Sequence, residues 1–467
     1  MSIRLLGPSL AAGLLCAAAS AQTFAHDVPL SGLGNGNPAK PFGITAEPVT
    51  GVLYVAIAGD FLGNNEVVAV IDGATDTVTG TIPAGLFPED VAVAYDAAGQ
   101  PTVAAVTNST SGSVTVWDVA TGTVLADVAL PDPFGWGSCY PFGIAAGGPG
   151  FWVTTFDGSG MVYAVDTGTL QADPGAAFDL GGGRSGGRLL VAGGDLFIPS
   201  SGFTPTWTGG EGGLITRRGG AVTADYVVAS QDGTGLFPAG QDLVRLPDGR
   251  LILGGTDFGP RLYLLAPDGT LERTLRLSRG GGVHGLAISP DGKLVAACDL
   301  AGNTVFLLDA LNLVELSATD TTSVGLGYAQ PNDAAFLNGK LYVSCQANEE
   351  VIVFDGLPNP VPGAGYAGSL VLSDPTPGRG GTVTATVSGP GTVALLVALD
   401  DQASVVSGVA LDIGPTPTLA GWGAGSFSRS WTMPAAAGAR GVNLFAQGVV
   451  DASGSPRPTA PRVAVIQ

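Results

Sequence analysis

Three aspartates, Asp90, Asp242 and Asp333, are the residues of this sequence best suited to chemistry. A short apolar run directly follows each of them. Carboxylate oxygens are the ligands that hard cations such as Ca²⁺ prefer, so three carboxylates converging on one axis would form a divalent-cation site. The alternative is that each carboxylate accepts backbone N–H groups at the start of its own strand. The sequence leaves both interpretations open.

A histidine and an arginine begin comparable segments. His284 follows the glycines at 280–282, and an imidazole in this place suits acid–base chemistry or a structural hydrogen bond. In one of these segments the pattern is degenerate, and Arg188 is the residue that best matches the position of the aspartates in the others. Together with Arg245 and Arg250, Arg188 adds a cationic side that could orient an anionic ligand.

Aromatic residues precede the same segments and predict a binding surface. Flat aromatic faces suit sugars or peptides, whereas the alternative is that they cap the spaces between structural units. We take Trp136, Tyr140 and Trp207 as candidate binding residues beside Arg188 and His284. The aromatic residues of these segments are Phe87, Phe134, Trp136, Tyr140, Phe142, Phe203, Trp207, Phe237 and Tyr328.

Two catalytic motifs occur without the structural context that they need. Residues 183–187 match the nucleophile elbow G-x-S-x-G, and residues 181–186 match the dinucleotide fingerprint G-x-G-x-x-G. Both lie in one glycine-rich stretch with no helix pattern after it. We therefore assign no catalytic residue.

A repeat of about 47 residues defines the elements that must position these side chains. Each unit contains an apolar run whose last residue is bulky, and this residue is usually followed by Asp and a turn. Such a period with strand-like patterning predicts an all-β chain with a seven-bladed β-propeller over residues 23–356, one four-stranded blade per repeat. The repeat marks lie at residues 71–72, 117–118, 165–166, 215–216, 265–266, 308–309 and 354–355.

The last repeat lacks an outer strand, and the missing strand is predicted at the beginning of the propeller. Residues 26–32 have the shape of an outer strand, so we expect them to pair into the last blade and seal the ring. In this fold the third residue of each inner strand lines the mouth of the central channel. Around the ring these residues are Gly43, Asp90, Gly143, Arg188, Asp242, Gly285 and Asp333.

The first repeat carries Leu53-Tyr54-Val55, then AVIDGATDTV at 69–78 and TIPAG at 81–85. This unit resembles the YVTN β-propeller repeat. The second repeat fits as well, and its Trp117-Asp118 is also similar to WD repeats. The third, sixth and seventh fit loosely, and the fourth and fifth depart furthest. The resemblance implies a propeller fold and an exported or surface role, and it implies no reaction.

The two ends of the chain predict export and a second domain. Residues 1–21 have the charge, short apolar stretch and small-residue cleavage site of a signal peptide, which predicts a secreted, extracellular or periplasmic protein. No later stretch is apolar for the roughly 18 residues of a membrane span. Residues 357–364 form a Pro/Gly linker, and the alternating strands of 365–467 predict a small β-sandwich.

Export also permits a disulfide among Cys139, Cys298 and Cys345. Cys298 and Cys345 occupy matching places in adjacent blades, so they are a candidate pair if the two strands approach closely enough for bridging geometry.

Charge is unevenly distributed along the chain. The net charge is −20, and residues 41–183 contain no Lys or Arg against 15 Asp and Glu, whereas residues 184–279 contain ten Arg. This balance argues against a nucleic-acid partner. It suits solubility, or a surface that collects divalent cations.

The sequence therefore favours an exported, non-catalytic β-propeller that binds a cell-surface protein or a carbohydrate through the loop face around its channel. No cofactor is expected beyond a possible Ca²⁺ or other divalent cation. The alternative is a metal-dependent hydrolase of the lactonase type with a cation in the channel. A quinoprotein-like oxidoreductase is a third option, for which the sequence offers no evident cofactor contacts.

Overall fold

The structure is a computed structural model. It describes residues 22–35, 37–60, 63–148, 150–181, 184–202, 212–227, 240–255, 261–310, 314–358, 369–373, 377, 380–399, 404–406, 409–411, 417–433, 435, 443–451, 457–458 and 462–465. The predicted signal peptide, Trp207 and most of the predicted linker lie outside these residues.

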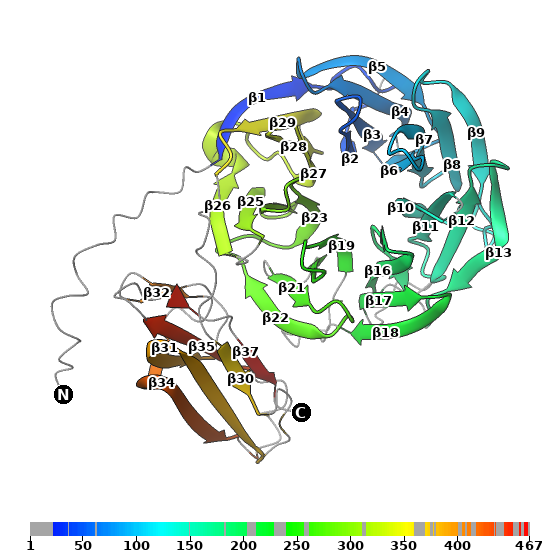
Figure 1. Ribbon diagram of the computed structural model, residues 1–467. Coiled ribbons are helices and arrows are strands. Elements are labelled where there is room, and N and C mark those ends of the chain that lie inside the picture. Colours follow the sequence, from blue (N-terminus) through cyan, green and yellow to red (C-terminus); the bar gives the residue numbers. More distant parts are fainter. Residues whose placement is uncertain are drawn as a thin grey trace.

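Up to Asp355 the chain forms successive antiparallel sheets around a central opening, and within each sheet the consecutive strands run from the centre outward, with β1 at the outer rim (Figure 1). The first three sheets contain β2 (Pro41–Glu47), β3 (Val52–Asp60), β4 (Gly63–Asp72), β5 (Thr77–Pro83); β6 (Pro88–Tyr95), β7 (Pro101–Asn108), β8 (Ser113–Asp118), β9 (Val124–Ala129); β10 (Pro141–Gly147), β11 (Gly150–Thr155), β12 (Met161–Asp166) and β13 (Gln171–Asp179).

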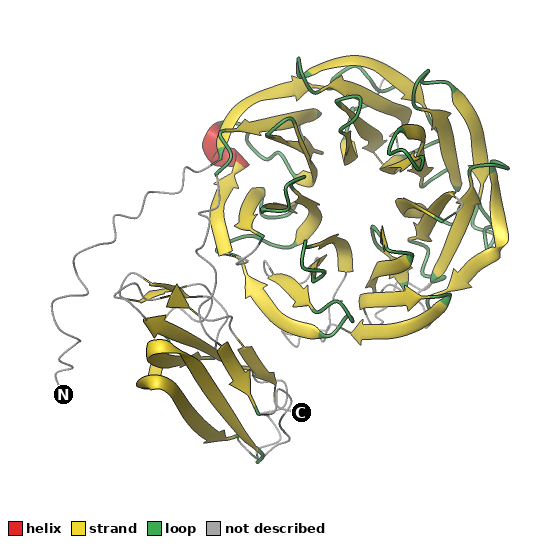
Figure 2. Ribbon diagram, viewed as in Figure 1, coloured by secondary structure: helices red, strands yellow, loops and turns green. Residues whose placement is uncertain are grey.

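Three further sheets continue the ring, and the last three ring strands join β1. The strands are β14 (Ser185–Gly186), β15 (Leu190–Ala192), β16 (Asp195–Ser201), β17 (Gly213–Arg218), β18 (Ala221–Val227); β19 (Gly240–Arg245), β20 (Leu251–Gly255), β21 (Arg261–Leu265), β22 (Leu271–Arg276); β23 (Val283–Ile288), β24 (Leu294–Asp299), β25 (Thr304–Asp309), β26 (Val314–Asp320); β27 (Pro331–Leu337), β28 (Lys340–Cys345), β29 (Glu350–Asp355) and β1 (Thr23–Pro29). The 3-10 helix η2 (Thr321–Val324) follows β26, and strands make up nearly everything else in Figure 2.

The first strand of the ring pairs with the last. β1 lies antiparallel to β29, with His26 opposite Val353 and Val28 opposite Val351. This pairing gives the β27–β29 sheet its fourth strand. The edge of the last sheet is therefore covered by the first strand of the ring.

The hydrophobic core lies between neighbouring sheets. One cluster joins Leu53 and Ile71 of the β2–β5 sheet to Tyr342 and Val353 of the β27–β29 sheet. Since each sheet contacts a sheet on both faces, its middle strands are apolar on both sides, as in the almost continuously buried β3. This explains the high hydrophobic content of the sequence, because a strand buried on both faces shows no polar alternation.

The aspartates of the repeat mark cap turns. Asp72 accepts the backbone N–H groups of Ala74 and Thr75 at 2.7 and 2.9 Å. Asp118 accepts the N–H of Thr121 at 2.8 Å in the same way. These hydrogen bonds to the ionised carboxylates hold the pKa of Asp72 and Asp118 below its usual value. Where the mark carries an Asp, that residue therefore forms the turn that follows the third strand.

The sheet that contains β14 to β18 departs from this plan. Its inner strand is broken into the two short segments β14 and β15, which both pair with β16. Between the two segments, Arg188 donates its backbone N–H to Gln241 of the next sheet at 2.8 Å. The break therefore attaches this stretch to a neighbouring sheet and turns Arg188 toward the centre of the ring.

The C-terminal strands form a separate sheet. Its order is β30-β31-β35-β36, with β34 on β31 and β37 on β35, and β32 pairs with β33 in a small ribbon. The predicted β-sandwich stays a prediction. The strands are β30 (Ser369–Leu372), β31 (Thr382–Ala398), β32 (Ser404–Val406), β33 (Val409–Leu411), β34 (Thr418–Thr432), β35 (Asn443–Asp451), β36 (Arg457–Pro458) and β37 (Arg462–Val465).

The candidate disulfide between Cys298 and Cys345 is wrong for this structure. Both thiols are buried and free, as is Cys139. Cys298 and Cys345 belong to one hydrophobic cluster between the β23–β26 and β27–β29 sheets, where they pack as small apolar residues. Among the described residues, no helix has the length and hydrophobicity that crossing a bilayer requires.

Candidate functional site

The three aspartates proposed as metal ligands each link two neighbouring sheets. Asp90 on β6 accepts the N–H of Val91, its own neighbour, and of Ile144 on β10, both at 3.0 Å. Asp242 on β19 accepts the N–H groups of Leu243 and of Leu286 on β23, both at 2.7 Å. Each carboxylate therefore caps its own strand and attaches the next sheet.

Asp333 completes this pattern across the point where the ring closes. It accepts the N–H of Ala334 at 2.8 Å and the N–H of Ile44 on β2 at 3.0 Å. Together with β1, this hydrogen bond ties the last sheet to the first. The structure thus shows the interpretation in which the aspartates cap strand starts, with the addition that each cap reaches a second sheet.

Glycines on the receiving strands let each of these strands approach the segment that follows it in the ring. A Cβ on Gly43, Gly143 or Gly285 would clash with the backbone carbonyl oxygen of a residue in the neighbouring sheet, and these residues are Glu89, Gly187 and Asn332 in the same order. The inner strands approach one another closely at these positions, and only a residue without a side chain permits that approach.

Arg188 lies between the three carboxylates. Its Nε is 3.9 Å from Asp90, and its Nη1 is 3.8 Å from both Asp242 and Asp333. Nη1 also donates to the backbone carbonyl of His284 at 3.3 Å. All four residues are more than nine-tenths buried. The guanidinium therefore places a positive charge where the sequence suggested that a metal ion could bind.

Burial dominates the electrostatics of this central cluster, which we define as Arg188, Asp90, Asp242, Asp333 and Glu89. Desolvation raises the pKa of Asp90 to about 6, although the Arg188 charge opposes the shift. Desolvation also raises the pKa of Asp242 and of Asp333. Burial by itself would lower the pKa of Arg188, but the surrounding carboxylates outweigh it, so the guanidinium stays charged.

The geometry of the cluster does not fit the predicted divalent cation. A guanidinium within 4 Å of all three carboxylates would repel a second cation, and both oxygens of each carboxylate already accept N–H groups. In the part of the chain that the structure describes, no three His, Cys, Asp or Glu side chains are grouped as metal ligands. Metal binding at Asp90, Asp242 and Asp333 therefore stays a prediction without geometric support.

His284 lines the channel beside this cluster. Burial, followed by the charge of Arg188, lowers the pKa of His284 to about 4. The imidazole is therefore neutral at physiological pH and is a poor proton donor there. The neighbouring Asn332 side chain opposes this lowering of the pKa but does not offset it.

Aromatic rings surround the cluster at the channel mouth. The Arg188 guanidinium lies over the ring of Phe42, 5.7 Å from its centroid. Phe42 contacts Phe87 and Phe142 with centroids 6.4 and 6.0 Å apart, and Phe142 contacts Phe156 at 5.4 Å. Phe87 and Phe142 are buried, so these two members of the predicted aromatic set cover the spaces between sheets, which is the alternative interpretation.

The loop before β10 instead exposes its aromatic side chains. Trp136 and Phe134 are 44% and 40% exposed, and their ring centroids lie 4.8 Å apart at an interplanar angle of 31°. Asp132 accepts the N–H groups of Phe134, Gly135 and Gly137 at 3.2, 2.9 and 2.7 Å. The carboxylate therefore shapes the loop and presents the ring pair to solvent.

Tyr140 lies at the base of this loop. Its backbone has a φ of 47°, its N–H donates to Ser138 Oγ at 2.8 Å, and its carbonyl accepts the N–H of Phe156 at 2.8 Å. The phenol is half-buried. Trp207, the remaining candidate, lies outside the described residues.

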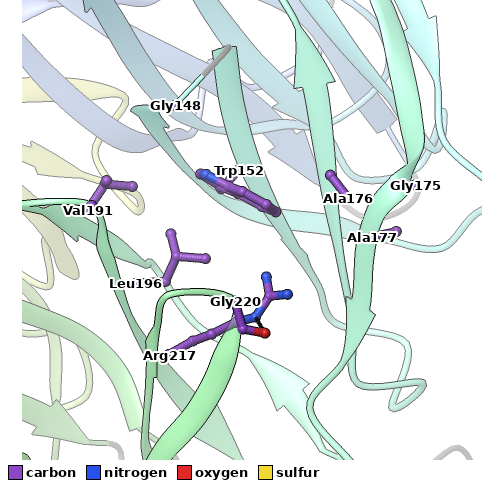
Figure 3. Close-up of a pocket in the computed structure, with 10 residues that line it drawn as sticks. Gly148, Trp152, Gly175, Ala176, Ala177, Val191, Leu196, Arg217 and Gly220 are labelled. Carbon is purple, nitrogen blue, oxygen red and sulfur yellow. Dashed lines mark hydrogen bonds between the residues drawn. The ribbon is translucent and has the colours of Figure 1, made fainter.

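A groove between the β10–β13 and β14–β18 sheets was not predicted. Trp152 of β11 and Arg217 of β17 line it, and Figure 3 shows both side chains with Val191 and Leu196 around the cavity. The predicted repeat mark at 215–216 is two residues off here: the register of β17 places Arg217-Arg218 where β8 has Trp117-Asp118.

Comparisons with known proteins agree with the architecture. No family model matches the chain, and no curated protein matches it. Hydrazine synthase from Kuenenia stuttgartiensis has a similar solved structure, with a TM-score of 0.54 and 17% identity over 70% of this chain and 98% of that chain. The β-propeller domain of Cps50 (Swd1) from Myceliophteria thermophila has a TM-score of 0.52 and 11% identity, covering 72% of this chain and 99% of that one. At these identities the likeness shows the fold alone: the ring has a β-propeller fold.

Proposed function

We propose that this protein is an exported, seven-bladed propeller of the YVTN type, closed by β1, that binds a carbohydrate through its loop face and performs no catalysis in its channel. The observation that supports this proposal is the central cluster. Asp90, Asp242 and Asp333 each hold two backbone N–H groups and face Arg188. These interactions use the groups that a channel-based catalyst would need.

The exposed Phe134–Trp136 pair supports the choice of a carbohydrate. The two rings pack against each other, and their outward faces offer apolar surface to the C–H groups of a sugar ring. The Asp132 hydrogen bonds hold the loop in place, so less conformational entropy is lost on binding. The strongly negative chain is a poor partner for anionic polymers, which favours neutral sugars. A cell-surface protein is the runner-up partner.

Binding can be tested with the labelled mature protein on a microarray of neutral glycans. We expect retention on some glycans and about 3- to 10-fold weaker binding by Trp136→Ala, as the loss of one stacking contact implies. Trp422→Ala is the matched control, because Trp422 is exposed on β34 in the C-terminal sheet. Equal binding by wild type and Trp136→Ala, or no bound glycan, would contradict the proposed site.

The alternative of a metal-dependent hydrolase has its own test. Calorimetry with Ca²⁺ and Mg²⁺ should show no binding heat at the channel. In the presence of Ca²⁺, the protein should hydrolyse δ-valerolactone no faster than the same buffer without protein does. A metal-dependent rate that disappears in Asp90→Asn would instead establish the hydrolase.

A further inference from the structure

The groove between the β10–β13 and β14–β18 sheets has the size of a small-molecule site. Its volume is about 320 Å³, and its walls include Trp152, Val191, Leu196 and Arg217 (Figure 3). The remaining lining residues are glycine and alanine, so the lining side chains are apolar apart from the indole N–H and the guanidinium. This volume lies at the lower end of the range of roughly 300–1,000 Å³ found for ligand pockets.

Arg217 is a cation without a counter-charge. Its guanidinium carbon lies 3.7 Å from the centroid of Phe178 and 6.0 Å from that of Trp152. Its Nε donates to the carbonyl of Gly220 at 3.0 Å. Among the described residues, no carboxylate lies within 4.0 Å of it. Partial burial lowers the pKa of Arg217, and no acidic group opposes that shift.

The same place between the first two sheets is filled. There, Tyr54 of β3 packs against Trp117 of β8, with ring centroids 5.4 Å apart and both side chains buried. Trp117 is the fifth residue of the six-residue β8, and Arg217 is the fifth residue of the six-residue β17. At this position β8 has a core aromatic and β17 has an arginine. Beside the arginine the space between the two sheets is an open groove that contains an unpaired charge.

The polar side-chain groups that line the groove are hydrogen-bond donors. Arg217 has Nη groups beyond its Nε bond, and the Trp152 indole N–H has no acceptor in the described part of the chain. A site with donors and no acceptor side chain selects a ligand that accepts hydrogen bonds, and the positive charge favours an anion.

We propose that this groove binds a small carboxylic acid with a flat apolar body, its carboxylate on Arg217 and its body against Trp152 and Leu196. The planar guanidinium suits the two oxygens of a carboxylate, while the apolar walls favour a hydrocarbon or aromatic body over a bare inorganic anion. The net charge of −20 disfavours general binding of anions to the chain, so an anion that binds here is held by the groove itself.

Calorimetry on the full mature chain with benzoate and phenylacetate tests the proposal, with benzamide as the neutral control of the same shape. We expect saturable binding of at least one acid, no measurable binding of benzamide, and about 10- to 100-fold weaker binding by Arg217→Leu. Arg217→Lys keeps the charge and should retain part of the affinity. Thermal unfolding of each variant checks that it is folded.

A second measurement locates the ligand. In ¹H–¹⁵N spectra of the wild type, the indole signal that disappears in Trp152→Phe should shift when benzoate is added. Absence of saturable binding of both acids up to about 10 mM would overturn the proposal. Binding that Arg217→Leu leaves unchanged, or that leaves the Trp152 indole signal in place, would overturn it as well.

Discussion

Arg188 and Arg217 belong to one sheet of the ring, and their surroundings are opposite. Arg188 lies at the break between β14 and β15, more than nine-tenths buried, with Asp90, Asp242 and Asp333 all within 4 Å. Arg217 lies on β17, half-buried against Phe178, and no carboxylate among the described residues is near it. The first charge is neutralised by the chain itself, whereas the second is left for a ligand.

This difference shows how one fold produces a closed and an open polar site. At the centre, inner strands from every sheet converge, so a long side chain from one strand meets acids from several others. Between the outer parts of two sheets, only those two sheets contribute side chains. A charge placed there has few possible partners, and an anion from solvent can then complete the site.

The largest expected effect is that of removing Arg188. Arg188→Leu leaves three buried carboxylates without their cation, so we expect a loss of about 3–5 kcal/mol in the free energy of unfolding. Chemical denaturation at pH 7.5 measures this loss. Arg188→Lys keeps a positive charge and should lose less. A change below about 1 kcal/mol for Arg188→Leu would show that the carboxylates do not depend on the guanidinium.

The second effect concerns the link that closes the ring. Asp333→Asn removes the charge and one of the two acceptor oxygens, so we expect a loss of about 1–3 kcal/mol in unfolding free energy. Asp355→Asn, at the exposed end of β29, is the matched control and should change stability by less than about 0.5 kcal/mol. Equal effects of the two substitutions would contradict the linking role of Asp333.

The third effect is a pH dependence that arises in the buried centre. Burial raises the pKa of Glu89 to about 8, from 4.5 for a free glutamate. The folded state therefore holds a proton that the unfolded state has lost, so stability falls as pH rises from about 4.5 to about 8. One such group contributes a slope of up to about 1.4 kcal/mol per pH unit.

Glu89→Gln isolates this contribution. The variant should match the wild type near pH 4 and be increasingly more stable than it toward pH 8, because glutamine has no proton to lose. Urea denaturation across this range measures the difference. Parallel pH profiles for the two proteins would show that Glu89 is not a buried neutral acid.

The smallest expected effect tests the open site. Arg217→Leu removes a charge that has no partner in the chain, so we expect the unfolding free energy to change by less than about 1 kcal/mol in the absence of ligand. The informative comparison is between the changes in unfolding free energy of Arg217→Leu and Arg188→Leu. A loss of about 3 kcal/mol or more for Arg217→Leu would indicate that Arg217 has a structural partner and is not available to a ligand.

Several features of the fold could be predicted from the sequence because they are periodic. The repeat mark predicts a strand followed by a turn, and Asp72 and Asp118 cap such turns. The third position of the inner strands predicts which side chains converge, and the structure brings Arg188, Asp90, Asp242 and Asp333 together. Local strand and turn preferences specify a position in a repeat, and repetition then places equivalent positions around one axis.

Other features depend on contacts between sheets, which the repeat does not encode. The reach of Arg188 across the channel depends on the break between β14 and β15, where the repeat pattern fails. Whether the three aspartates surround a metal ion or an arginine depends on which group occupies the space between their carboxylates. The free thiols of Cys298 and Cys345 and the groove beside Arg217 depend likewise on packing between neighbouring sheets.

The sequence by itself therefore determined the strands, their repetition and the ring of positions at the channel mouth, because these follow from local patterns that recur about every 47 residues. Only the tertiary structure decided that Arg188 neutralises the acids of the centre while Arg217 keeps an unpaired charge. The physical reason is that electrostatic pairing depends on distances of a few ångströms between residues that are far apart in the chain.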